Sequence, residues 1–159
     1  MFLIPIEGLV ECIEKTFNTL NTGDMIKYSK YLGTGANQKI IEVELLHQVR
    51  LKYPDAEYYH PKDNNKENLQ DIYSEKENAG CEVKACQAKR VRWRHSTIKN
   101  GDVNFLFIRY TVDDNGIYHL EYAFYGPMKY EDWSLDKSKN RTSLYVLPSL
   151  VSKCCKQII

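Results

Sequence analysis

The stretch Gly80-Cys81-Glu82-Val83-Lys84-Ala85-Cys86 carries the pattern from which we interpret the whole chain. It is small or apolar throughout, apart from one acid and one base two positions apart. Alternate side chains of a β-strand leave the same face, so Glu82 and Lys84 should point together while Val83 points into a core. Because a buried carboxylate and a buried ammonium both need partners, the stretch predicts a polar site on a mostly buried strand.

A second acid precedes this strand. Asp71 lies in Leu69-Gln70-Asp71-Ile72-Tyr73-Ser74, which reads as another strand, and turn-forming residues follow in Glu77-Asn78-Ala79-Gly80. A hairpin of this size would bring Asp71 beside Glu82, so that two carboxylates and Lys84 share one site. Carboxylates and water are the ligands that Mg²⁺ prefers, and a lysine can hold or activate a water that attacks phosphate.

The order Asp71…Glu82-Val83-Lys84 resembles the Asp-…-Glu-X-Lys motif of the PD-(D/E)XK nucleases, in the form found in type II restriction endonucleases. The residue before Asp71 is Gln70 rather than proline. A literal Pro-Asp occurs at Pro54-Asp55, so Asp55 stays an alternative acid, although its context is that of a turn after a helix. A cross-strand ion pair on a solvated sheet is the structural alternative for all of these charges.

The resemblance implies roles for the individual residues. Asp71 and Glu82 would bind Mg²⁺ with the Val83 carbonyl as a possible third ligand, and Lys84 would position the attacking water. The helix before the catalytic strands of this family often supplies a glutamate with apolar residues three and four positions later. Glu42, followed by Leu45 and Leu46, matches that pattern; alternatively, it is a boundary residue whose carboxylate reaches water.

A basic segment follows the motif strand directly. No acid occurs between residues 83 and 101, and Arg90, Arg92 and Arg94 alternate with Val91 and Trp93. If the segment is extended, the three guanidinium groups share a face that can grip phosphate or read guanine. Trp93 could stack on a base or anchor the segment in the core. The alternative is a solvated edge strand whose arginines prevent aggregation. The predicted DNA-binding residues are Lys89, Arg90, Arg92, Trp93, Arg94, His95 and Lys99.

Composition sets the remaining bounds. The chain has 159 residues, of which 43% are hydrophobic and 27% charged, with a net charge of +1; this predicts a single folded domain over 1–159. Five cysteines without a Cys-x-x-Cys pair argue against zinc and favour free thiols in a reducing cytoplasm. No secretory signal and no apolar run of membrane-spanning length is present, so we expect a cytoplasmic protein without membrane association.

Hydrophobic periodicity predicts an α/β or α+β domain: a mixed central sheet of about five strands flanked by helices, similar to restriction endonucleases. Helices are expected over 5–20, 24–32 and 38–52, the last capped by Asn37 after a loop over 33–36, and an irregular connection over 53–68. Further strands are expected over 104–112, 117–125 and 142–147, with a turn at 113–116, a short helix or turn at 130–135 and a closing helix over 148–159. Gly126-Pro127 should end the strand that presents Tyr118, Leu120, Tyr122 and Phe124 on one face.

Together, these expectations predict a function for the protein. The sequence predicts a Mg²⁺-dependent, sequence-specific endonuclease that acts on double-stranded DNA. A homodimer is the simplest way to cut both strands at a fixed position. Within enzymes, the alternative is a structure-selective nuclease such as a Holliday-junction resolvase. Outside enzymes, the alternatives are a non-catalytic DNA-binding subunit and a purely structural interaction domain.

Overall fold

The computed structural model describes residues 2–24, 26–29, 31–64, 70–95, 103–136 and 143–159. Its element order is α1 (Ile6–Thr22), α2 (Ile26–Ser29), α3 (Thr34–Lys52), η1 (Pro54–Ala56), η2 (Pro61–Asn64), β1 (Ile72–Ser74), β2 (Ala79–Cys86), β3 (Trp93–His95), β4 (Val103–Val112), β5 (Tyr118–Met128), η3 (Tyr130–Asp132), β6 (Ser134–Asp136), β7 (Ser143–Val146), α4 (Pro148–Cys154) and β8 (Lys156–Gln157). The η elements are single 3₁₀ turns.

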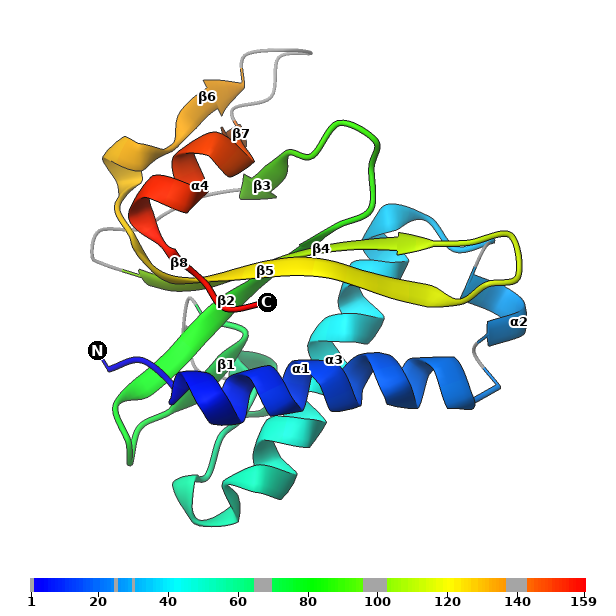
Figure 1. Ribbon diagram of the computed structural model, residues 1–159. Helices are drawn as coiled ribbons and strands as arrows, with labels where there is room; N and C mark the ends of the chain where they lie inside the picture. The colour runs from blue at the N-terminus through cyan, green and yellow to red at the C-terminus, as the bar shows by residue number, and fades with distance from the viewer. Residues whose placement is uncertain (1, 25, 30, 65–69, 96–102, 137–142) are drawn as a thin grey trace.

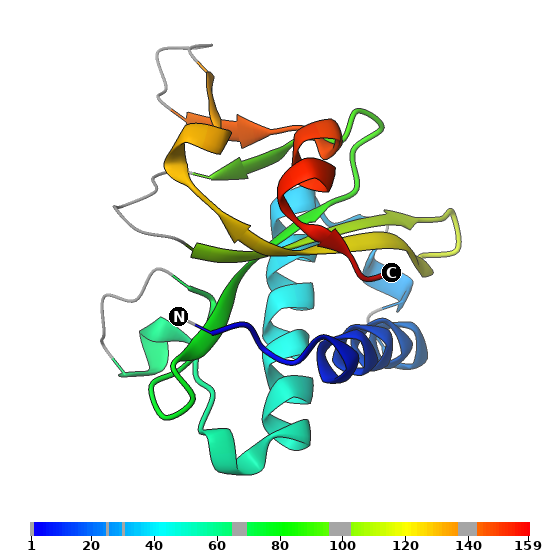
Figure 2. The same cartoon turned by 60° about the vertical axis from the view of Figure 1, so that its left-hand side comes forward.

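The main sheet has the strand order β1-β2-β4-β5-β8. It is mixed, because β2 and β4 run parallel whereas the β1–β2, β4–β5 and β5–β8 pairs are antiparallel. Helices α1 and α3 cross beneath one face of this sheet, and a smaller sheet with α4 lies over the other face (Figure 1; Figure 2). The expected fold class, a mixed sheet of about five strands flanked by helices, is therefore confirmed.

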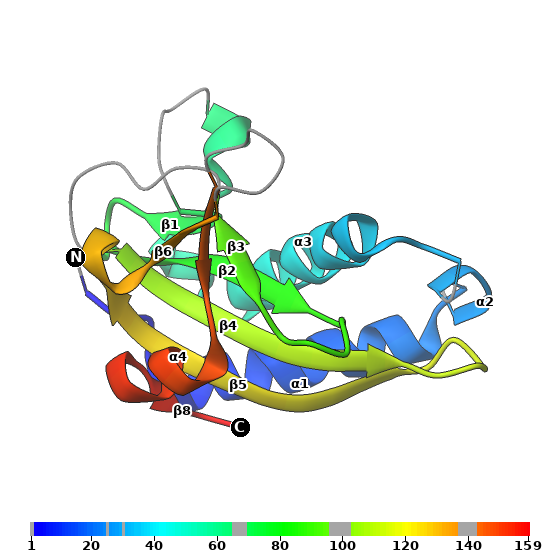
Figure 3. The same cartoon turned by 90° about the horizontal axis from the view of Figure 1, so that it is seen from above.

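The second sheet was not expected from the sequence. It has the order β3-β7-β6, with both pairs antiparallel, and seen from above it sits over β4 and β2 (Figure 3). Strand β7 was expected near residues 142–147, but it joins this sheet rather than the main one. The expected closing helix over 148–159 ends at Cys154 in α4, and the chain then adds β8 to the edge of the main sheet.

Two hydrophobic cores fill the spaces on either side of the main sheet. The core between the main sheet and helices α1 and α3 takes Leu106, Ile108 and Tyr110 from β4, whereas the core between the main sheet and the second sheet takes Phe105 and Phe107 from the same strand. This alternation is the two-residue period of a strand that is buried on both faces. It explains why residues 104–112 read as a nearly continuous apolar run.

The prediction that Tyr118, Leu120, Tyr122 and Phe124 share one face of β5 is wrong, because a β-bulge interrupts the strand. Arg109 pairs with Tyr122 but Tyr110 pairs with Leu120, so Glu121 is the extra residue. The bulge reverses the alternation along the strand. As a result Tyr118 and Leu120 face the helices, while Tyr122 and Phe124 face the second sheet.

Gly126-Pro127 does not end β5, which continues to Met128. Proline is tolerated there because the ladder to β8 involves only Phe124 and Tyr125, and proline is usually confined to strand positions that lack a partner on one side. The predicted turn at 113–116 is confirmed: Gly116 adopts a φ of 82° and its N–H donates to Asp113. The predicted short helix or turn at 130–135 is also found, as η3, and Trp133 beside it is buried.

The start of α3 differs from the prediction. The helix begins at Thr34, so the expected loop over 33–36 is mostly helical, and Gly33 is the N-cap without a side-chain hydrogen bond. Asn37 is buried inside the helix rather than capping it, and it accepts a 2.5 Å hydrogen bond from the Tyr118 hydroxyl. An asparagine can serve as a cap or as a buried anchor, and here the tertiary contact determines its role.

Candidate active site

Glu82 and Lys84 project from the same face of β2, as the two-residue period of a strand predicts. Glu82 and Lys84 are 6% and 9% exposed and leave one face, whereas Val83 is fully buried against the helices. The Lys84 ammonium Nζ lies 2.7 Å from Glu82 Oε1. An ion pair this buried is costly to form in isolation, because both charges lose water.

Asp71 lies at a bend directly before β1 rather than within a strand. Its carboxylate oxygen Oδ2 accepts a 2.9 Å hydrogen bond from the Val83 N–H, so the side chain closes the hairpin where the β1–β2 ladder ends at Ile72 and Cys81. Gly80 permits the close approach of the β1 backbone to β2, because a Cβ there would lie 2.4 Å from the Ile72 carbonyl oxygen. The alternative acid, Asp55, is exposed on η1 immediately after α3.

Two residues complete the cluster from elsewhere in the chain. Glu42, 5% exposed on α3, pairs with Lys39 one turn before it and lies 3.0 Å from His60 Nε2. The same His60 nitrogen is 3.9 Å from Asp71 Oδ1. One ligand atom each from Glu42, His60 and Asp71 lies within 4.8 Å of the others, so these three could hold a metal ion.

His60 was missed by the sequence analysis. Its position depends on the backbone of its neighbour Tyr59, which exchanges hydrogen bonds of 2.9 and 3.1 Å with Tyr73 on β1. That isolated bridge fixes the segment before η2 against the edge of the main sheet. No spacing pattern predicts such a contact, and the four histidines look scattered in the sequence.

The cluster carries more negative charge than its enclosed position favours. The pKa of Asp71 is raised to about 8, first by burial and then by the nearby Glu82 and Glu42 carboxylates, against the opposing effects of Lys84 and the Val83 N–H. A divalent cation would relieve this repulsion, and the oxygen-rich set of Asp71, Glu82 and Glu42 suits the hard ion Mg²⁺. The carboxylates are thus of the kind that the implied metal needs, but among the described residues the ligand group within 4.8 Å consists of Glu42, His60 and Asp71, without Glu82.

His95 lies on the same side of the main sheet. Its Nδ1 is 3.7 Å from Glu82 Oε1, and its ring contacts Phe105 and Trp133. Burial, together with the charge of Lys84, lowers the pKa of His95 to about 4, so its imidazole is neutral at neutral pH. Of the predicted DNA-binding residues that the structure describes, His95 is thus the one that lies within 4 Å of Glu82.

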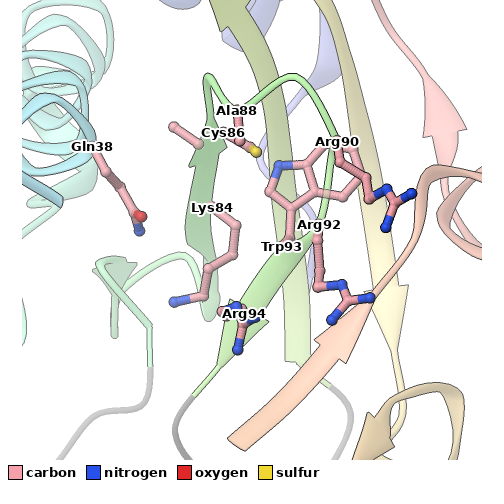
Figure 4. Close-up of a pocket in the computed structure, with 9 residues that line it drawn as sticks. Gln38, Lys84, Cys86, Ala88, Arg90, Arg92, Trp93 and Arg94 are labelled. Atoms are coloured by element: carbon pink, nitrogen blue, oxygen red, sulfur yellow. The ribbon is translucent and has the colours of Figure 1, made fainter. Parts of the chain in front are cut away.

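A cationic hollow of about 450 Å³ opens next to the carboxylates. Lys84 lies between Gln38 of α3 and the side chains of Arg90 and Arg92 (Figure 4). The residues that line it are Gln38, Lys84, Ala85, Cys86, Ala88, Arg90, Arg92, Trp93 and Arg94. Lys84 therefore belongs both to the acidic cluster and to this cationic hollow.

The arginines are not arranged as one alternating strand. Only Trp93–His95 is extended as β3, and Arg90 and Arg92 lie in the irregular segment before it. Arg92 and Arg94 both approach Asp136 of β6, at 3.8 and 2.6 Å, and the Arg92 guanidinium stacks 4.3 Å from the Tyr145 ring centre. The second sheet therefore positions two of the three guanidinium groups.

Trp93 is 1% exposed, and its ring centre lies 5.1 Å from that of Phe107. Its indole N–H donates to the Ile108 carbonyl, so it anchors the segment in the core and is not available to stack on a base. Lys89 and Arg90 are exposed, whereas Lys99 lies outside the described residues.

Comparisons with known proteins add no relative from which a role could be transferred. No protein-family model matches the chain, and neither a curated protein nor a solved structure matches it.

Proposed function

We propose that this protein hydrolyses phosphodiester bonds of double-stranded DNA in a Mg²⁺-dependent reaction, as a sequence-specific endonuclease of the restriction-enzyme kind. The observation that carries the proposal is the convergence of Asp71, Glu82 and Glu42 with Lys84 at one enclosed site. These are the residues that the resemblance to PD-(D/E)XK nucleases assigns to catalysis. Asp71, Glu82 and Lys84 are brought together by one hairpin, and Glu42 joins them from α3, which is distant in the sequence.

Each side chain has a distinct task in this proposal. Asp71 and Glu82 would hold Mg²⁺ together with the Val83 carbonyl, and Glu42 would complete the site. When bound, the metal polarises the phosphate and favours ionisation of a water. Lys84 would orient the attacking water and stabilise the negative charge that develops on the phosphate. Its ammonium is already held beside the carboxylates by Glu82, at 2.7 Å.

A purely structural ion-pair network accounts less well for the site. Among the described residues, Lys84 neutralises Glu82, and Lys39, which pairs with Glu42, is about half exposed. In the part of the chain that the structure describes, the ion-pair contact of Asp71 is a long one, 3.9 Å to His60 Nε2, and its pKa is raised to about 8 by burial and by its acidic neighbours despite the charge of Lys84. A network selected only for stability would be expected to balance its buried charges.

The cationic hollow supports a polyanionic substrate. Lys84 and three arginines line it, directly beside the proposed metal ligands. Arginine can hold phosphate oxygens bidentately, so a DNA backbone lying in the hollow would place a phosphate near Lys84. Arg90, Arg92 and Arg94, with Lys89, are the proposed DNA contacts. A homodimer would present two such surfaces to the two halves of a palindromic site.

The described residues contain no helix whose length and hydropathy would suit a membrane span. All five cysteines are free, which fits the reducing cytoplasm that we propose as the location of this activity.

Plasmid cleavage tests the proposal directly. The purified protein is incubated with plasmid DNA and Mg²⁺, in parallel with Asp71→Asn and with Asp55→Asn as a matched control on the exposed η1. Discrete fragments from the parent and from Asp55→Asn, with none from Asp71→Asn, would support sequence-specific cleavage. A smear would instead indicate a non-specific nuclease. Cleavage restricted to branched DNA would indicate a structure-selective one, and no cleavage of any substrate would contradict the proposal.

A further inference from the structure

The nitrogen ligand in the cluster sets it apart from an all-oxygen Mg²⁺ site. His60 Nε2 lies 3.0 Å from Glu42 Oε1 and 3.9 Å from Asp71 Oδ1. Ligand atoms bound at about 2.0–2.2 Å from one ion lie at most about 4.4 Å apart. The ligand atoms of Glu42, His60 and Asp71 already lie within 4.8 Å of one another. They would therefore have to move together by only a few tenths of an ångström to bind one ion.

The three side chains are held in place by different parts of the fold. Glu42 is carried by α3, Asp71 is tied to β2 through the Val83 N–H, and His60 follows the Tyr59–Tyr73 backbone bridge. Their side chains are only 6%, 17% and 15% exposed, respectively. A site that is assembled in advance and partly shielded from water binds metal with little loss of conformational freedom.

Lys39 supplies a second, independent observation at the same place. Its ammonium is paired with Glu42 Oε1, the same oxygen that lies within hydrogen-bond distance of His60. Lys39 is about half exposed, so its flexible side chain can swing into solvent at low cost. In the metal-free protein, the Lys39 ammonium therefore supplies the positive charge that the Glu42 carboxylate favours.

We propose that Glu42, His60 and Asp71 form a mixed nitrogen–oxygen site that prefers a first-row transition ion, such as Co²⁺ or Mn²⁺, to Mg²⁺, and that Lys39 is the resident cation displaced on binding. Imidazole favours borderline transition ions, whereas Mg²⁺ favours oxygen ligands alone. The inference deepens the proposed function and rests on it only in treating the carboxylate cluster as a metal site. Asp71 and Glu42 would be shared with the proposed Mg²⁺ set that includes Glu82.

Titration calorimetry with CoCl₂, MnCl₂ and MgCl₂ tests the preference without any DNA. The expected order of affinity for the full chain is Co²⁺, then Mn²⁺, then Mg²⁺. His60→Gln should weaken Co²⁺ binding at least about tenfold, since losing even an outer-shell partner of a metal ligand costs about 10–100-fold, and should change Mg²⁺ binding less. The visible absorption of bound Co²⁺ should shift in the same variant. His47→Gln removes an exposed imidazole of α3 and should change neither property.

Lys39→Met gives a test of opposite sign. Removing the competing ammonium should tighten binding of the transition ions about two- to fivefold, which is the range expected for a partly exposed ion pair. Lys15→Met is the control, because it removes a lysine that also forms an ion pair within one helix, with Glu11 on α1, but with no proposed metal ligand. An unchanged or weaker affinity in Lys39→Met would contradict the displacement.

The outcomes separate this inference from the proposed function. If His60→Gln lowers the affinity for all three ions equally, or if the parent binds Mg²⁺ as tightly as Co²⁺, the mixed site is refuted even when DNA is cut. If the ions bind in the expected order but no DNA is cleaved with any of them, the mixed site stands and the nuclease proposal fails.

Discussion

Replacing Asp71 with Asn should stabilise the metal-free protein. Asparagine keeps an oxygen that can accept the hydrogen bond from Val83, but it removes a carboxylate from beside Glu82 and Glu42. The free energy of unfolding should therefore rise, whereas loss of a buried polar side chain usually lowers it. The same substitution should weaken metal binding, because a neutral amide is a poorer ligand for a divalent cation than a carboxylate.

The size of the stability gain from Asp71→Asn can be worked out from its dependence on pH. The pKa of Asp71 is about 8 in the folded protein, above the usual value of 3.8, so between these values the folded state holds a proton that the unfolded state has lost. Stability then falls as pH rises, by up to about 1.4 kcal/mol per pH unit for one proton. This loss of stability, which comes from ionising Asp71 in the folded protein, is absent below about pH 4 and complete above about pH 8. Because relaxation and water reduce such effects, we expect Asp71→Asn to gain about 1–3 kcal/mol at pH 7.

Urea denaturation in EDTA at pH 5, 6, 7 and 8, followed by tryptophan fluorescence, measures this difference. The advantage of Asp71→Asn should grow with pH, and at pH 7 a gain of 2 kcal/mol would raise Tm by about 4–8 °C. Added Mg²⁺ should stabilise the parent and reduce the advantage. Asp55→Asn, exposed on η1, should stay within about 0.5 kcal/mol of the parent. A difference that is zero or negative and independent of pH would refute the repulsive cluster.

Four further predictions follow from the same structure. Lys84→Ala should bind DNA in Ca²⁺ about as well as the parent but cleave it at least about a hundredfold more slowly in Mg²⁺, as single-turnover rates would measure; an equal loss of binding would assign Lys84 to phosphate contact. Arg92→Ala or Arg94→Ala should weaken binding to all sequences and lower the salt slope by about one in fluorescence titrations if the residue contacts phosphate, or cost about 1–3 kcal/mol at one base pair if it reads a base. Trp93→Ala should destabilise the fold by about 3–5 kcal/mol in urea denaturation rather than act selectively on DNA affinity. Sedimentation analysis should find two protein chains on a palindromic duplex, and a strictly monomeric complex would contradict the dimer.

The centre of the candidate site could be predicted because it depends on local rules. The two-residue period of a strand places Glu82 and Lys84 on one face, and a short turn returns the chain so that Asp71 lies beside Val83. The helical period likewise put Glu42 on the side of α3 that faces the sheet. These residues need only one turn and one helix contact to meet.

The other parts of the site and of the fold depend on contacts between distant residues, which no local sequence pattern predicts. His60 reaches the cluster through a backbone bridge between Tyr59 and Tyr73. Strands β3, β6 and β7 have only three or four residues each, too few to show a clear alternation, so the second sheet was missed. The face of β5 was predicted wrongly because one bulged residue, Glu121, shifts the period. Asn37 has the sequence context of a helix cap, but its buried hydrogen bond with Tyr118 places it inside α3.

Strand β2 couples the candidate site to the stability of the fold. Cys81, Val83 and Ala85 face the core between the main sheet and helices α1 and α3, while Glu82 and Lys84 face the opposite side. A slip of one residue would turn both charges into that core and Val83 out of it, so the register is strongly specified. The hydrogen bond from the Val83 N–H to Asp71 adds a second constraint on the same register. The hydrophobic packing of β2 thus holds Glu82 near Asp71 despite the repulsion between their carboxylates, and a core substitution such as Val83→Ala should loosen the candidate site as well as the fold.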